Sequence, residues 1–269
     1  MISLSGKIWT QQKINKNLVE KAKQDYGLGD FLSQLIISRN YDISEIYGIH
    51  NNQKLTNIFK NDKDYLKASL ILLNSINNNE NICILGDYDV DGACATSLLV
   101  RYFIHINQKH YFYIPDRVTD GYGASKKLFQ KLILKKPKLV IMVDCGSTSN
   151  EAIDYLNKHN IKSIIIDHHE INKPYPKSDV IINPKKELIK KENSLLCATA
   201  LTYFFIEILV KKTQSNFKIS NFLIYVLLAT VCDVMPLRKI NKIIARNTIS
   251  DFKLKNNAAL SYIFDQFNF

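Results

Sequence analysis

The sequence has few cysteines and places none of them in pairs. The 269 residues include five, Cys83, Cys94, Cys145, Cys197 and Cys232, each alone in an apolar segment. This spacing supplies neither the paired ligands of a structural zinc site nor the framework of a small disulfide-rich protein. We therefore expect reduced, buried thiols, which are typical of a cytoplasmic protein.

Long hydrophobic runs are also missing. The longest, residues 222–232, is too short to span a bilayer and predicts a buried helix. Residues 1–9 lack the apolar core of a signal peptide, so we expect no membrane partner. A Gly-x-Gly-x-x-Gly turn, which would indicate a Rossmann dinucleotide site, does not follow the first predicted strand.

Acidic residues are outnumbered by basic ones. The 36 Lys and Arg against 25 Asp and Glu give a formal charge of +11, which favours a polyanionic partner such as nucleic acid. The chain is also rich in Asn and Ile, and the nucleotide composition of a genome produces the same bias without selection for binding. The hydrophobic fraction of 46% fits a globular protein of one large domain or two small ones.

Short apolar runs alternate with helical patterns through the middle of the chain. Strands are predicted at residues 82–85, 111–114, 139–143, 163–166 and 180–182. Helices are predicted from residue 93 and over residues 125–135, 150–159, 195–211 and 221–231. The alternation predicts an α/β fold, with a parallel sheet covered by helices on both faces. We expect a helical region at 1–79, a catalytic domain at 80–250 and the start of a connecting helix at 251–269.

Polar side chains follow the carboxyl ends of three predicted strands. They are Asp87, Asp89 and Asp91 after the first strand, Asp144 after the third, and Asp167, His168 and His169 after the fourth. In open parallel sheets, binding sites form beyond these ends, so we expect the side chains to converge on one crevice. Asp144 also has an alternative interpretation as a turn and helix cap.

The three aspartates at alternate positions leave an extended backbone from one face. Like charges so close resist ionisation unless a cation lies between them, and carboxylate oxygens suit magnesium or manganese. Gly92 then permits a tight turn into the next helix. An acidic turn without a metal is the alternative, because Asp and Gly are ordinary turn formers.

A further carboxylate, Asp233, lies in an apolar segment ahead of Pro236. A buried carboxylate needs a compensating partner, and a metal ion would provide one. The alternative is a cap on a new turn. The full mixed set of oxygen and nitrogen donors consists of Asp89, Asp91, Asp144, His168 and Asp233. This set suits a pair of manganese or magnesium ions, which predicts hydrolytic phosphoryl transfer without a serine or cysteine nucleophile.

Four segments, taken in order, resemble the motifs of the DHH phosphoesterase superfamily. They are Gly-Asp-Tyr-Asp-Val-Asp-Gly at 86–92, Val-Asp-Cys-Gly at 143–146, Asp-His-His at 167–169 and the segment around Asp233. Within that superfamily the chain is similar to the RecJ family of single-stranded-DNA-specific exonucleases. This likeness rests on residues 114–117, 121–123, 183–185 and 229–237, and on a helical lead-in with Trp9 and Arg39.

The resemblance implies a role for each matching position. Asp89, Asp91, Asp144, His168 and Asp233 would be metal ligands, with Asp144 bridging two ions, and Asp87 would be a ligand or a neighbour of one. His169 would face the substrate phosphate, and Asp167 would orient the histidines. Arg117 and Tyr122 would position the substrate or contact its phosphate.

The resemblance also implies the activity: 5′ to 3′ hydrolysis of single-stranded DNA in repair and recombination, with two Mn²⁺ or Mg²⁺ ions. RecJ proteins continue into a DHHA1 domain and an OB-fold, whereas this sequence ends at Phe269. We therefore expect single-stranded DNA as partner, together with a separately encoded DHHA1/OB half or a single-strand-binding protein. Two alternatives remain: an enzyme for short oligonucleotides or cyclic dinucleotides, and a truncated or split subunit that is inactive alone. Leu-Cys-Ala-Thr-Ala at 196–200 departs from the glycine-containing family segment and should tighten the start of a helix.

Overall fold

The computed structural model describes residues 3–8, 10, 12–41, 45, 53–121, 123–186 and 193–267. It divides the chain into two compact units, Met1–Lys54 and Leu55–Phe269. In the first unit, α1 (Lys16–Tyr26) packs against α2 (Asp30–Ser38). Helix α1 begins at the Asn15 side chain, which accepts hydrogen bonds from two backbone N–H groups, and ends at Gly27 in the left-handed conformation.

The second unit is built on five parallel strands in the order β2-β1-β3-β4-β5. They are β1 (Ile82–Leu85), β2 (His110–Tyr113), β3 (Leu139–Val143), β4 (Lys162–Ile166) and β5 (Val180–Ile182). The predicted parallel sheet is confirmed. Strand β2 begins and ends one residue earlier than predicted. His110 pairs with Ile82 of β1, and its ring packs on Phe103 with centroids 5.5 Å apart.

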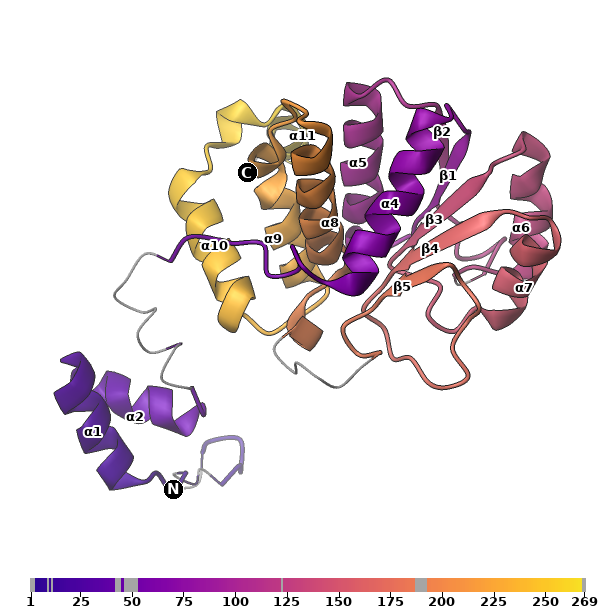
Figure 1. Ribbon diagram of the computed structural model, residues 1–269. Coiled ribbons are helices and arrows are strands. Elements are labelled where there is room, and N and C mark those ends of the chain that lie inside the picture. The colour runs from indigo at the N-terminus through magenta and orange to yellow at the C-terminus, as the bar shows by residue number, and fades with distance from the viewer. Residues whose placement is uncertain are drawn as a thin grey trace. The chain divides into compact units, whose positions relative to one another are not determined.

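Helices cover both faces of the sheet, as predicted (Figure 1). Helices α4 (Lys63–Asn77), α5 (Val90–His105) and α8 (Ala198–Thr213) share a buried core with Ile82 and Ile84 of β1. The alternate residues of the same strand, Cys83 and Leu85, face α6 (Lys126–Leu132) and α7 (Asn150–Lys158). The period of two in a strand therefore divides the apolar side chains between two cores.

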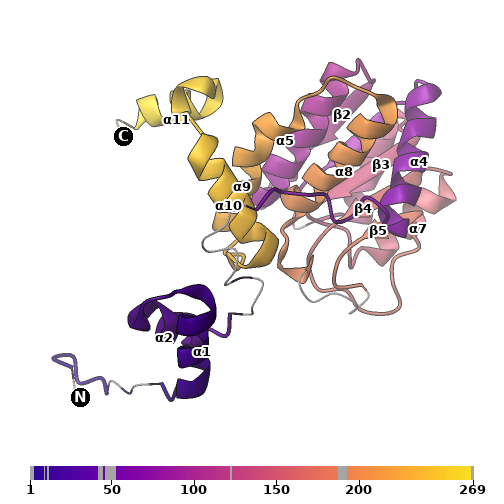
Figure 2. The ribbon, with the colours of Figure 1, turned by 60° about the vertical axis from the view of Figure 1, so that its left-hand side comes forward.

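Three helices follow α8: α9 (Leu223–Cys232), α10 (Lys239–Asp251) and α11 (Ala258–Gln266), which lie beyond α8 in Figure 2. Four short 3₁₀ turns complete the described elements: η1 (Ile133–Lys135), η2 (Asn193–Leu195), η3 (Ile219–Phe222) and η4 (Leu254–Asn256). Across the described part of the chain, no helix combines the length and apolar character needed to cross a lipid bilayer. The domain boundaries predicted at residues 79 and 250 stay a prediction. Helix α4, which precedes the first of these boundaries, packs with α8 and β5 in the sheet unit.

Two sequence expectations about burial are wrong in part. Helix α9 buries only Val226, Ala229 and Thr230, because it packs on α5, α8 and α10 from one side and leaves its other side open. All five cysteines are free thiols, but Cys232 is exposed at the open end of this helix and Cys94 is half-buried. The remaining three cysteines are buried, as expected.

Gly92 is required by a close backbone contact at the start of α5. A Cβ atom at this position would lie 2.5 Å from both the N and the O of Asp87. We expect Gly92→Ala to lower the free energy of unfolding by about 3 kcal/mol, since a backbone cannot yield as a flexible side chain does. Chemical denaturation measures the loss. Gly29→Ala is the control, because its added Cβ meets nothing within 4 Å, and an equal loss in both variants would contradict this explanation.

Candidate metal centre

The polar residues that follow the strands meet at the carboxyl edge of the sheet. Asp87 lies in the loop after β1, and Asp89 and Asp91 begin α5. Asp144 follows β3 in a left-handed conformation with φ of 61°, which Asp tolerates better than most residues. The Asp-His-His segment at 167–169 follows β4, and Asp233 caps the end of α9. The acids and histidines that the sequence predicts to converge therefore lie close together at this edge of the sheet.

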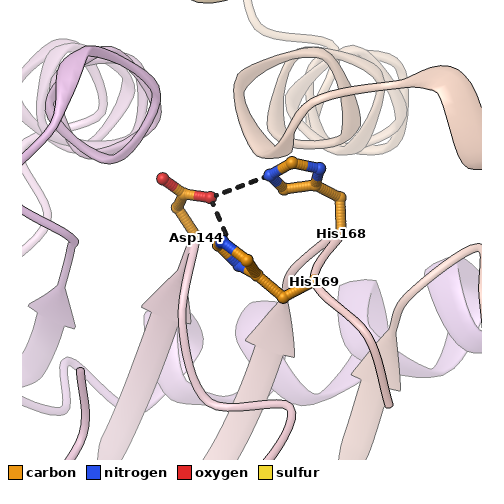
Figure 3. Close-up of side chains that lie close together, drawn as sticks. All are labelled: Asp144, His168 and His169. Carbon is orange, nitrogen blue, oxygen red and sulfur yellow. Dashed lines mark ion pairs between the residues drawn. The ribbon is translucent and has the colours of Figure 1, made fainter. Parts of the chain in front are cut away.

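His168 lies at the middle of this group. Its Nε2 is 3.3 Å from Asp144 Oδ1 and 3.4 Å from Asp233 Oδ2. Asp91 Oδ2 is 3.6 Å from the same nitrogen. Figure 3 shows Asp144 pointing toward both histidine rings, with His169 Nδ1 3.8 Å from Asp144 Oδ1. Side chains from four separate segments of the chain thus face one small volume.

Three sets of side chains offer ligand atoms within 4.8 Å of one another in the described residues. One set is Asp91, His168 and Asp233; another is Asp87, Asp89 and Asp144; the third is Asp144 with both histidines. Asp144 is shared by the second and third sets, so it lies beside both groups of candidate ligands. A carboxylate at such a position is a candidate bridge between two cations.

Several atoms of the site are buried without a hydrogen-bond partner among the described residues. They are both carboxylate oxygens of Asp144, both ring nitrogens of His168 and Oδ2 of Asp233. Burial and the neighbouring charges of Asp91 and Asp89 raise the pKa of Asp144 well above its ordinary value. Burial also raises the pKa of Asp233 and of Asp87. Buried carboxylate and imidazole atoms that make no hydrogen bond fit divalent cations, which accept oxygen and nitrogen lone pairs at once.

Asp91 differs from the other acids because hydrogen bonds already hold its carboxylate. Its Oδ2 accepts from the Ala198 N–H at 2.7 Å, and its Oδ1 accepts from the Thr199 N–H at 2.8 Å. The Thr199 hydroxyl donates to the Asp91 backbone carbonyl at 2.9 Å. Cys197, the residue before α8, provides no cap of its own. Asp91 therefore caps α8 from another helix, and it holds the start of that helix against the site.

Asp167 organises the histidine loop. Its Oδ1 accepts hydrogen bonds from the backbone N–H groups of His168 and His169 and from His169 Nδ1 at 2.8 Å, while its Oδ2 accepts from the Ser147 N–H. Burial opposes ionisation of this acid, but the His169 bond and charge and the Ser147 bond hold the pKa of Asp167 well below its usual range. The hydrogen bond to Asp167 and the charge of that carboxylate in turn raise the pKa of His169. Asp167 therefore holds the ring of His169, as expected, but it contacts His168 only through the backbone N–H.

Asn183 is a site neighbour whose contacts the sequence did not reveal. Its Nδ2 donates to the Ser147 hydroxyl at 2.8 Å and to the His169 backbone carbonyl at 2.9 Å. It links the loops after β3, β4 and β5. A signal was available, since Asn183 directly follows a predicted strand, where the other site residues also lie.

Of the two residues predicted to contact the substrate, the structure describes Arg117 but not Tyr122. The Arg117 guanidinium lies over the ring of Tyr88, 5.4 Å from its centroid, beside the acidic loop. Asp116 shapes its turn by accepting hydrogen bonds from the N–H groups of Val118 and Thr119. Tyr122 and Trp9 lie outside the described residues.

The fold and site together define an α/β protein with a candidate metal site, lined by acids and histidines, at the carboxyl edge of a parallel sheet. The family model described as "DHH family, N-terminal domain" matches residues 81–230, and the chain belongs to this family. The match covers all five strands and every candidate ligand except Asp233.

The relatives that the chain matches include RecJ proteins. It is 23% identical over 254 residues to the single-stranded-DNA-specific exonuclease RecJ of Bacillus subtilis, covering 94% of this chain and 32% of that protein. Identity to the Escherichia coli protein of the same name is 29% over 191 residues, covering 66% of this chain and 33% of the relative. The chain therefore spans about a third of the length of these relatives.

Solved structures show the same fold. The crystal structure of RecJ in complex with Mn²⁺ from Thermus thermophilus matches with a TM-score of 0.76 at 18% identity, covering 94% of this chain and 36% of that one. A second structure, of exonuclease RecJ bound to manganese, matches with a TM-score of 0.64 at 23% identity, covering 70% of this chain and 48% of that one.

Proposed function

We propose that this chain is a metal-dependent phosphodiesterase whose ligands are Asp89, Asp91, Asp144, His168 and Asp233. The observation that carries the proposal is the set of buried Asp144, His168 and Asp233 atoms that have no hydrogen-bond partner among the described residues. Burying such atoms together without a cation would lower the stability of the protein, because their lone pairs lose water and gain no partner in exchange. Asp87 is a further ligand or lies beside one.

A pair of Mn²⁺ or Mg²⁺ ions, when bound, supplies Lewis acidity toward a phosphate oxygen and lowers the pKa of a water molecule. The protein groups then have separate tasks. Asp144 would hold both ions, and His169, which pairs with Asp167, would face the substrate phosphate. Arg117 and Tyr122 position the substrate from the neighbouring loop.

The substrate that we propose is single-stranded DNA, degraded from the 5′ end in repair and recombination in the cytoplasm. This is supported by the names of the relatives and by the charge of +11, which favours a phosphate backbone. The relatives are about three times longer than the matched region. We also propose a DHHA1/OB half or a single-strand-binding protein as partner. Because positioning supplies much of catalysis, a chain lacking that half would be weak or inactive alone.

The test compares a long 5′-labelled single strand with a dinucleotide, each incubated with the purified chain and Mn²⁺. Release of nucleotides from the labelled end supports the exonuclease. Cleavage of the dinucleotide alone would favour a small-substrate enzyme, and activity that requires the DHHA1/OB half in trans would identify a split subunit. No cleavage under any of these conditions would overturn the proposal.

Metal removal gives an independent readout. We expect dialysis against EDTA to abolish hydrolysis and to lower the thermal midpoint of the sheet unit. Re-addition of Mn²⁺ at about 100 times its dissociation constant should restore about 2.7 kcal/mol of stability. Differential scanning fluorimetry measures the shift, and a midpoint that ignores Mn²⁺ would contradict a metal site.

A further inference from the structure

Helix α6 and the turn after it carry an unusual run of positive charge. The segment 126–138 contains no Asp or Glu, and its lysines are all exposed: Lys126, Lys127, Lys131, Lys135, Lys136 and Lys138. We call these six residues the α6 lysine stripe. Leu134 lies among them and is 78% exposed, so an apolar side chain also faces solvent there. Like charges so close repel one another, and a polyanion relieves the repulsion.

Few acids of the protein neutralise the stripe. Lys126 pairs with Glu151 at 3.4 Å, and Lys131 pairs with Asp120 at 3.2 Å. Lys135 lies over the ring of Tyr111, which leaves its charge in place. The other three lysines make no ion pair within the described residues. The stripe therefore keeps most of its positive charge available to a ligand.

The stripe begins at the candidate metal centre. A hollow of about 330 Å³ is lined by residues 123–126, residues 146–152, Asp167 and His169. Lys126 belongs both to this hollow and to the stripe. Its lining includes four hydroxyl residues and two glycines, which leave room for a phosphate and a sugar. Two carboxylates, Glu151 and Asp167, also line it, but Glu151 pairs with Lys126 and Asp167 pairs with His169. A chain whose end lies at His169 can thus continue from the hollow onto α6.

The position of α6 on the sheet gives the direction in which a bound strand would run from the hollow. Helix α6 starts at the carboxyl edge of the sheet, beside the hollow, and the chain reaches the opposite edge at Lys138, whose N–H donates to the Asn81 carbonyl just before β1. Figure 1 shows α6 beside α7 on the face of the sheet opposite α4 and α5. The lysines therefore span the height of the sheet on one face.

We propose that the α6 lysine stripe binds the phosphate backbone of a single-stranded nucleic acid and leads it away from the metal centre across the α6 face. The proposal rests on the proposed function for the substrate class, and it adds the route. Backbone binding of this kind is independent of sequence and strongly dependent on salt.

The experiment measures binding of a fluorescent oligothymidylate 20-mer by anisotropy over a range of salt concentrations, without divalent metal so that no cleavage occurs. One variant combines Lys127→Gln, Lys136→Gln and Lys138→Gln. The matched control removes the same charge elsewhere with Lys212→Gln, Lys218→Gln and Lys255→Gln, which are likewise exposed. Circular dichroism establishes that both variants fold.

Each phosphate contact on a single strand contributes about 0.7 to the slope of log affinity against log salt. We expect the stripe variant to lose about 2 units of slope and at least about tenfold in affinity, while the control changes neither. Equal losses in both variants, or none in the stripe variant, would overturn the route. Dinucleotide hydrolysis with Mn²⁺, measured on the same samples, reports separately on the phosphodiesterase. We expect this hydrolysis to be unchanged by the stripe substitutions. If the wild type showed no dinucleotide hydrolysis, the result would contradict the proposed phosphodiesterase activity but not the proposed route.

Discussion

Replacing Asp144 with asparagine or alanine is expected to abolish hydrolysis while leaving the fold intact. Asp144 is the acid that we propose to bridge two cations, and its buried oxygens make no hydrogen bond within the described chain. Losing several kcal/mol of charge stabilisation in the transition state corresponds to a fall on the order of 10³-fold in rate. Turnover with Mn²⁺ measures the effect, and near-normal turnover in a folded variant would show that Asp144 does not bridge.

Stability separates this loss of function from misfolding. In EDTA the wild type carries a buried carboxyl group that makes no hydrogen bond, so Asp144→Asn should not lower its thermal midpoint. Asparagine also tolerates the left-handed backbone at this position. The variant should lose most of the stabilisation that Mn²⁺ gives the wild type. A variant that melts early in EDTA would instead assign Asp144 a structural role.

Asp91→Ala is expected to have the opposite signature, with a large loss of stability even without metal. The substitution removes two charge-assisted hydrogen bonds that cap α8. Such bonds contribute about 1.5 to 3 kcal/mol each, so we expect a loss of about 3 kcal/mol or more in the free energy of unfolding. For a unit of this size, that loss lowers the thermal midpoint by roughly 6 to 12 °C.

The control for Asp91 is its neighbour Asp89, which is exposed and accepts one hydrogen bond from the Gly92 N–H. Asp89→Ala removes an ordinary helix cap and should cost about 1 kcal/mol. Urea denaturation in EDTA compares the two variants. If both lost the same stability, the cross-helix cap at α8 would not be the reason for the burial of Asp91.

The sheet and the meeting of the acids could be predicted because they follow from local rules. Buried strands such as 139–143 are short β-branched runs, and parallel strands bring their carboxyl ends to one edge. What could not be predicted depends on contacts distant in the sequence. The role of Asp91 as a cap for α8 requires knowing where α8 begins in space. Gly92 was expected to permit a tight turn, whereas the observed need is room for the Asp87 backbone.

Burial at the margins of the fold was predicted less well. Apolar composition alone indicated a buried helix at 222–232, but composition does not say how many neighbours a helix has. Cys232 is exposed for the same reason. Asn183 is a polar residue whose role depends on three loops meeting, and no single segment contains that information.

The cap that Asp91 gives α8 joins residues 107 and 108 positions apart. Closing so long a loop costs entropy before any contact forms, and contacts of this range slow folding. During synthesis, this cap cannot form until residue 199 has left the ribosome. A chain arrested before Asp233 would contain all five strands of the sheet but only part of the candidate metal site.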